Sequence, residues 1–115
     1  MIGGRVFKHS AVTCGAAAAE AAESVSADVF LLGVTGVHPV HGLTTGDPDE
    51  AAMKRTLARR AAETYVLASA EKLGPASRYL VLPLADVAAV VTDGQDHDVV
   101  RQLRQRGVAV LPVPV

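Results

Sequence analysis

The chain has 115 residues, fewer than the roughly 150 of a typical domain, so it holds one domain or part of one and not two independent cores. Half of the residues are hydrophobic but only 3% are aromatic, and with 20 Ala and 18 Val any core must pack small side chains closely. The net charge of -1 excludes the broad basic field of a domain that binds nucleic acid by charge alone. We therefore expect no direct contact with nucleic acid.

The cysteine content and the apolar runs of the sequence indicate in which cellular compartment the chain is expected. Cys14 is the single cysteine, which excludes an internal disulfide. The longest uncharged apolar stretch, 29–37, contains two glycines and a threonine and is shorter than the roughly 18 residues of a membrane span. The first residues lack the pattern of a signal peptide. We expect a cytoplasmic chain with no membrane partner.

The first elements in chain order are a short strand at 5–7 and an Ala-rich helix at 15–25. Residues 28–32 form a continuous apolar run, which predicts a strand covered on both faces, and 33–36 end it. Asp47 suits a helix N-cap, Pro48 the first helical position and Glu50 the capping-box position. These signals predict a helix from Pro48 to about residue 63.

The second half of the chain continues the alternation of strands and helices. Strands are predicted at 64–68, 80–82, 87–91 and 108–111, with a helix that begins at Asp96 and stops at Gly107. The inward positions of that helix are Val99, Val100 and Leu103. The order strand, helix, strand, helix, strand predicts an α/β fold with a mostly parallel sheet.

Several ordered blocks resemble the effector-sensing domain of DeoR-type bacterial transcriptional regulators. They are Gly3-Gly4, residues 27–37, 42–45 and 50–54, then 66–74, Pro83-Leu84 and 91–93. The resemblance spans about residues 3–110 and implies a three-layer, Rossmann-like sheet shared with ribose-phosphate isomerases and coenzyme A transferases. It also implies a phosphorylated sugar as the ligand, and we expect no cofactor and no catalysis.

The same resemblance bears on domain organisation. A winged helix-turn-helix and a first strand-helix portion with a Gly-Thr-Thr phosphate loop precede this region in the family, and neither is found in the sequence. We therefore expect residues 1–115 to form a partial sensor domain, truncated at its N-terminus and without a DNA-binding domain. A truncated sheet has an exposed edge and uncovered apolar surface, so we also expect a homo-oligomer.

The candidate ligand site begins where the strand at 28–32 ends. Gly33 and Gly36 follow its carboxyl end, where open α/β sheets bind ligands, and glycines let a phosphate approach the backbone closely. Thr35 lies between them, at a place where many members of the resembled family carry Asp. The alternative is a tight turn that uses glycine for backbone freedom alone.

The loop at 42–46 precedes the capped helix and adds Gly42, Thr44 and Thr45 to the candidate site. Its hydroxyls and the free amides of the helix can hold sugar hydroxyls or an anionic group, unless the loop only caps the helix. Lys54 lies on the flank of the apolar stripe of that helix and can reach a pocket edge; the alternative is a solvated lysine.

The last candidate, Lys72, comes from the resemblance. It stands in the position of the family's Asp-x-x-Lys sequence, whose lysine is thought to meet the sugar phosphate. Ser69 replaces the acidic partner, so two carboxylates that would grip sugar hydroxyls are missing at 35 and 69. Glu71 beside Lys72 equally predicts a surface ion pair of little energy.

Other chemistries have less support. His38 and His41 have H-x-x-H spacing, but Pro39 prevents a helix and no four-ligand zinc set is present, so we expect no metal. Ser69 and Cys14 lack a nucleophile context. An isomerase-like enzyme would need acid/base carboxylates that residues 33–36 do not supply. A structural or oligomerising α/β module without a ligand remains the alternative to a sensor.

Overall fold

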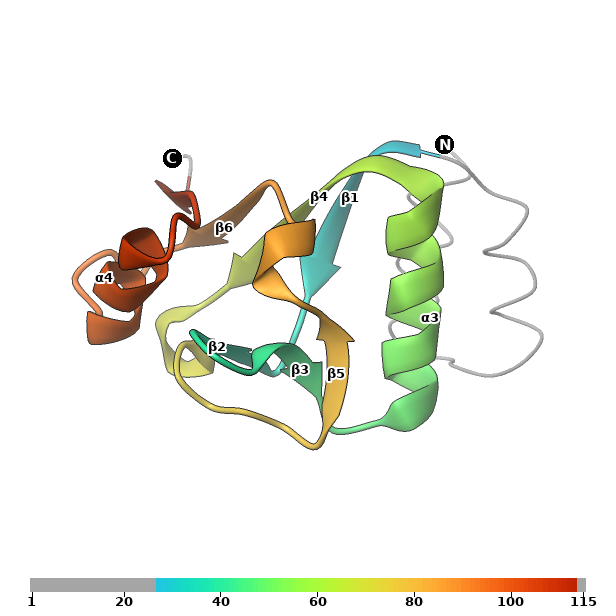
Figure 1. The fold of residues 1–115 in the computed structure, drawn as a ribbon, viewed down its shortest axis with the longest axis horizontal. Coiled ribbons are helices and arrows are strands. Elements are labelled where there is room, and N and C mark those ends of the chain that lie inside the picture. Colours follow the sequence, from blue (N-terminus) through green and yellow to red (C-terminus); the bar gives the residue numbers. More distant parts are fainter. Residues whose placement is uncertain (1–26, 114–115) are drawn as a thin grey trace.

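The computed structural model describes residues 27–113 (Figure 1). The strand expected at 5–7, the helix expected at 15–25 and Cys14 lie outside the described residues. In chain order the elements are β1 (Ala27–Gly33), β2 (Gly36–His38), β3 (Gly42–Thr45), α3 (Pro48–Arg60), β4 (Ala61–Ala68), the 3-10 turn η1 (Ala70–Lys72), β5 (Tyr79–Leu82), the 3-10 turn η2 (Leu84–Asp86), β6 (Ala89–Thr92), α4 (Asp98–Gln105) and β7 (Val110–Pro112).

A parallel sheet of four strands, in the order β1-β4-β6-β7, is the centre of the fold. Its register aligns Leu32 with Val66, Val66 with Val90 and Val90 with Val110, and all four side chains are buried. These residues form one core cluster with buried residues of α3 and α4, namely Ala51, Met53, Leu57, Val99, Val100 and Leu103. The α/β class with a parallel central sheet, predicted from the sequence, is confirmed.

The helices cover one face of this sheet because of the order of its strands. Each connection moves the chain one strand further in the same direction, and crossovers between parallel strands are right-handed. The connections through α3 and α4 therefore fall on the same side. The strand at 28–32 was predicted to be covered on both faces, and among the described residues this is wrong: Val29 and Leu31 are 45% and 55% exposed.

A second, antiparallel sheet in the order β2-β3-β5 lies beside α3 (Figure 1). Residues 42–46 were expected to form a loop, but residues 42–45 are the central strand of this sheet. Leu43 pairs with Val37 on one side and with Leu82, nearly 40 positions away, on the other. Pairing at this separation leaves no local pattern, and a four-residue segment is too short to show a strand period.

Helix α3 begins where the sequence predicts. The Asp47 carboxylate accepts hydrogen bonds from the amides of Asp49 (2.8 Å) and Glu50 (3.2 Å), and Pro48 occupies the first turn. The helix ends at Arg60 and not near residue 63, because residues 61–63 pair with β1 as the start of β4. Extended pairing with a neighbouring strand outweighs the helix propensity of two alanines and a glutamate.

Helix α4 begins two residues later than predicted. His97 is its N-cap: the Nδ1 atom accepts a hydrogen bond of 3.1 Å from the amide of Val99. The helix ends at Gln105, and Gly107, expected to stop it, follows the C-cap Arg106 with a φ of +83° that suits glycine. None of the helices in residues 27–113 is long and apolar enough to cross a membrane.

The Asp47 cap gives a first testable prediction. Replacing Asp47 with Ala removes the acceptor of two helix amides and should lower the free energy of unfolding by about 1 kcal/mol. Chemical denaturation followed by circular dichroism measures this change. The control Asp47→Ser keeps a capping oxygen and should lose much less; equal losses in both variants would contradict the capping role.

Two glycines of the candidate site give a second prediction. A Cβ on Gly36 would overlap the carbonyl oxygen of Pro75 and lie 2.8 Å from Thr44 Oγ1, so Gly36→Ala should cost about 1 to 3 kcal/mol of stability. A Cβ on Gly33 meets nothing within 4 Å, and Gly33→Ala should stay within about 0.5 kcal/mol of the unchanged protein. Denaturant unfolding of both variants measures the difference. A Gly36→Ala protein of unaltered stability would be contrary to the described packing.

Candidate functional site

Gly33 ends β1 at the carboxyl edge of the parallel sheet, where open α/β sheets bind their ligands. The residue is exposed, and the space that a Cβ would occupy is empty to 4 Å. Its carbonyl oxygen accepts a hydrogen bond of 2.6 Å from Lys54 Nζ. The structure thus brings together two residues that the sequence proposed separately, and leaves the backbone beside them accessible.

Lys54 is held in place by two oxygen acceptors. Besides the Gly33 carbonyl, its ammonium contacts Glu50 Oε1 at 3.0 Å, and its side chain is only 12% exposed. The Glu50 carboxylate, four residues earlier on α3, therefore forms an ion pair with Lys54. The solvated lysine considered in the sequence analysis is wrong: Lys54 is a largely buried cation at the carboxyl end of β1.

Thr35 and Thr44 lie in an internal hydrogen-bond cluster. Thr35 Oγ1 is 2.6 Å from Ser77 Oγ, the Ser77 amide donates to Thr44 Oγ1 (2.8 Å), and the Thr44 hydroxyl donates to the Gly36 carbonyl (3.4 Å). These contacts tie the segment before β5 to β2 and β3. No local sequence pattern indicates that Ser77 belongs to this cluster, because its partner Thr35 lies 42 positions earlier in the chain.

Gly36 and Gly42 have packing reasons for being glycine. A Cβ on Gly36 would overlap the backbone of Pro75, and Gly42 has a φ of +79° at the first residue of β3. Both glycines therefore fit the alternative, in which small residues serve backbone geometry. They shape the strands that carry Thr44 and Thr45.

Thr45 differs from the other threonines. It is fully buried, and within residues 27–113 its hydroxyl has no hydrogen-bond partner. An unpaired buried hydroxyl costs free energy, so its presence calls for a partner or an explanation. Thr45 lies two residues before the N-cap of α3, the helix that carries Lys54.

Lys72 lies in η1, which follows β4 at the same edge of the sheet as Gly33. Within residues 27–113 its ammonium makes no hydrogen bond or ion pair, and the surface ion pair expected with Glu71 is not formed. A hydrogen bond with the Ser69 side chain lowers the pKa of the Glu71 carboxyl below its usual value; its own backbone amide and, more weakly, the charge of Lys72 act in the same direction.

Two hollows in the surface of residues 27–113 lie away from these residues. Each has a volume of about 460 Å³, and neither is lined by any of the eight candidate residues. Arg101 and Arg104 line the hollow beside α4, but Arg101 contacts Asp98 at 2.9 Å and Arg104 donates to Gln95 Oε1 and the Val110 carbonyl. The cations of the hollow beside α4 therefore already have partners, and neither hollow lies at the carboxyl edge of β1, where open α/β sheets bind ligands.

The histidine pair does not offer a metal site in this conformation. His38 Nδ1 accepts hydrogen bonds from the amides of Val40 (3.0 Å) and His41 (3.1 Å), so the ring proton belongs on Nε2 and no free lone pair remains. The His41 ring packs against it, with centroids 4.5 Å apart. Within residues 27–113 no group of three or more His, Cys, Asp or Glu side chains is placed to hold a metal.

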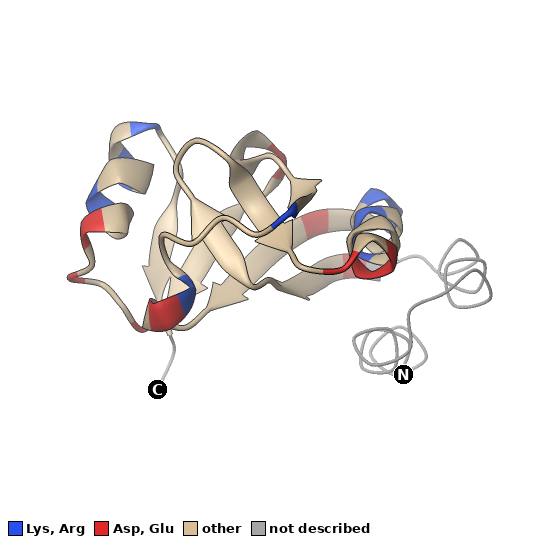
Figure 2. Ribbon diagram, turned by 90° about the horizontal axis from the view of Figure 1, so that it is seen from below, with Lys and Arg blue, Asp and Glu red and all other residues tan. Residues whose placement is uncertain are grey.

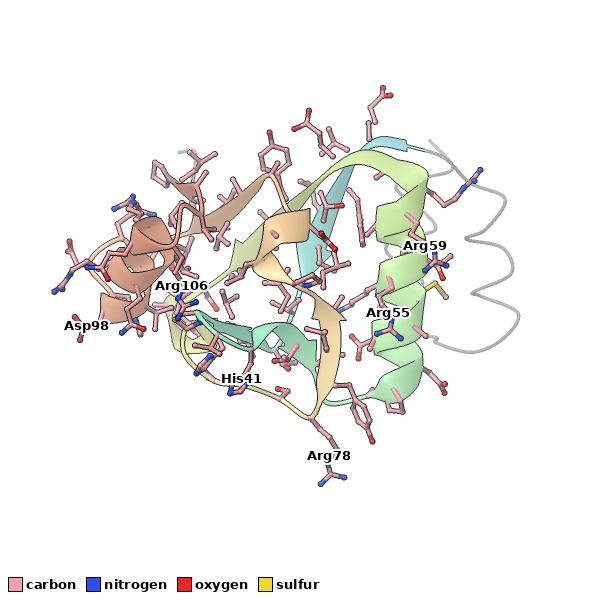
Figure 3. All side chains as sticks on the ribbon, in the orientation of Figure 1. His41, Arg55, Arg59, Arg78, Asp98 and Arg106 are labelled. Carbon is pink, nitrogen blue, oxygen red and sulfur yellow. The ribbon has the colours of Figure 1, made fainter. Side chains whose placement is uncertain are left out.

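Charges of both signs share the two helices. Figure 2 shows Lys and Arg beside Asp and Glu on α3 and on α4, in agreement with Asp49 and Glu50 in the first turn of α3 and Arg59 and Arg60 in its last. In Figure 3 the side chains of Arg55 and Arg59 lie along α3, while Arg78 points outward from the start of β5. Arg55 donates to the Leu80 carbonyl at 2.6 Å, so it ties α3 to β5.

Comparisons with known proteins agree with this architecture. The family model described as the DeoR C terminal sensor domain matches residues 1–94. An uncharacterized HTH-type transcriptional regulator FruR of Bacillus subtilis is 33% identical over 96 residues, which are 84% of this chain and 38% of that protein. The HTH-type transcriptional regulator GlpR of Haloferax volcanii is 30% identical over 112 residues, 96% of this chain and 44% of that protein.

A third relative, the HTH-type transcriptional repressor GlcR of Bacillus subtilis, is 29% identical over 93 residues, 81% of this chain and 36% of that protein. The chain thus spans about two-fifths of the length of these relatives. All three are transcriptional regulators, and a sensor domain of such regulators is not catalytic. The resemblance seen in the sequence is confirmed, and the chain belongs to the DeoR C-terminal sensor domain family.

Proposed function

We propose that the chain is a non-catalytic effector-binding domain of a transcriptional regulator and that its effector is a phosphorylated sugar. The observation that carries the proposal is the carboxyl edge of β1, where the exposed backbone of Gly33 lies against the largely buried Lys54. An exposed peptide edge with a neighbouring cation suits an anion that also presents hydroxyl groups.

Each candidate residue has a proposed role. Lys54 and Lys72 bind the phosphate; Lys54 already has two oxygen acceptors, whereas Lys72 has no competing partner among the described residues. The hydroxyls of Thr35, Thr44 and Thr45 contact the sugar, and for Thr45 a ligand hydroxyl would satisfy an otherwise unpaired group. The glycines that shape the backbone around them are Gly33, Gly36 and Gly42.

The proposal also covers the localisation of the domain and the partners that it binds. We propose that residues 1–115 act as a sensing domain in the cytoplasm, without contacting DNA themselves, and that they self-associate. The outer edges of β1 and β7 carry no partner strand within residues 27–113, and unpaired edges favour association. A structural module without a ligand is the second candidate, favoured by the internal hydrogen bonds of Thr35 and Thr44.

A thermal-shift screen of the whole chain against a panel of sugar phosphates separates the two candidates. A ligand at 100 times its dissociation constant should add about 2.7 kcal/mol of stability. The unphosphorylated sugars are the matched controls and should give smaller shifts. No shift with any member of the panel at millimolar concentration would favour the structural module.

Lys72 tests the site once a ligand has been found. Lys72→Ala should weaken binding by about ten- to a hundredfold, because a charge-assisted hydrogen bond contributes about 1.5 to 3 kcal/mol. Calorimetry measures the affinity, and an unchanged unfolding midpoint shows that the fold is intact. Arg78→Ala removes an exposed cation outside the candidate site and is the control. Equal affinities of the Lys72→Ala and unchanged proteins would exclude Lys72 from the site.

A further inference from the structure

Two segments leave the parallel sheet side by side at its carboxyl edge. Ala68, the last residue of β4, pairs with Thr92, the last residue of β6. From there the chain continues as η1, which carries Lys72, and as the loop 93–97 between β6 and α4. The register of the sheet therefore brings this loop beside the turn that carries one of the candidate ligand residues.

The Asp93 carboxylate of this loop contacts the first residue of η1. Its Oδ1 atom accepts a hydrogen bond of 3.0 Å from the amide of Ala70, 23 positions earlier in the chain. Within residues 27–113 the N-cap of the turn, Ser69, makes no capping hydrogen bond with its side chain. Amides at the start of a helical turn have no partner inside the turn, so Asp93 supplies the cap that Ser69 does not.

The loop that carries Asp93 is itself fixed against β6 and η1. The Thr92 hydroxyl accepts a hydrogen bond from the Gly94 amide (3.0 Å), and the Thr92 carbonyl accepts one from Gln95 Nε2 (2.8 Å). A Cβ on Gly94 would lie only 3.0 Å from the Cβ of Ala70, so a glycine is needed for the loop to approach the turn this closely. The position of the Asp93 side chain is thus set by the end of β6.

The other end of η1 is held by β2. The buried Leu73 pairs with Val37, and the amide of Gly74 donates to the Val37 carbonyl at 2.8 Å. Lys72 therefore lies between two points of attachment. Because the Asp93 carboxylate bonds with the backbone and not with Lys72, the Lys72 ammonium has no competing partner among the described residues.

We propose that Asp93 is a positioning residue of the candidate site: it holds η1 in place and so keeps the Lys72 ammonium available to a phosphate at the carboxyl edge of the sheet. The inference rests on the role proposed above for Lys72. A turn that is already ordered costs less conformational entropy when an anion binds. The acceptor oxygen of Asp93 carries this role and not its charge, because a negative charge near a bound anion opposes binding.

Amide hydrogen exchange on the whole chain tests the first step without a ligand. In Asp93→Ala the amide of Ala70 loses its acceptor and should exchange about tenfold faster. Asp93→Asn keeps an oxygen acceptor on a side chain of the same shape and should retain the protection. Asp96→Ala removes the same charge from the same exposed loop and is the matched control. An Ala70 exchange rate that Asp93→Ala leaves unchanged would overturn the inference.

A titration with inorganic phosphate, followed by the amide chemical shifts of residues 69–73, tests the second step. Asp93→Ala should weaken phosphate binding by about three- to tenfold, whereas Asp93→Asn should bind at least as tightly as the unchanged protein. In a Lys72→Ala background Asp93→Ala should cause no further loss, because Asp93 acts through Lys72.

Two results of the titration contradict the positioning role. One is a further loss of the same size in the Lys72→Ala background, and the other is an Asp93→Asn protein that binds phosphate as weakly as Asp93→Ala. If phosphate shifts none of these amides in the unchanged protein, the role proposed for Lys72 is wrong and the inference fails with it. The exchange rates then still show whether Asp93 holds η1, so the two failures are distinguishable.

Discussion

The packing of one face of the parallel sheet against α3 and α4 is the constraint on which the rest of the domain depends. The strand residues that make this contact are branched, mostly Val and Leu, so the helices can pack closely against the sheet. The edge that carries Gly33 is held to α3 by the hydrogen bond from Lys54. Core packing and candidate site thus share one helix.

Neighbouring cations on α3 connect the two sheets. Lys54 donates to the Gly33 carbonyl of the parallel sheet, and Arg55 donates to the Leu80 carbonyl of the antiparallel sheet. These two hydrogen bonds, together with the core packing of Ala51, Met53 and Leu57, attach α3 to both sheets.

The sequence predicts the features that depend on neighbouring residues. The cap at Asp47, the glycine at 107 after α4 and the strand formed by the apolar run 28–32 all have local causes, and each is found in the structure, although one face of that strand is exposed. It misses the features that depend on distant pairing. β3 is a strand because Leu43 lies between β2 and β5, and residues 61–63 leave the helix because β1 pairs with them.

In the candidate site, too, the sequence predicts the local features and misses those that depend on distant residues. The sequence places Gly33 at the end of a strand and Lys54 on the flank of a helix, as the structure does. Only the fold brings Lys54 Nζ to 2.6 Å from the Gly33 carbonyl oxygen. It does not indicate that Thr44 bonds with Ser77, whereas Thr45 next to it has no partner among the described residues. Adjacent strand residues point to opposite faces, so two identical threonines meet different surroundings.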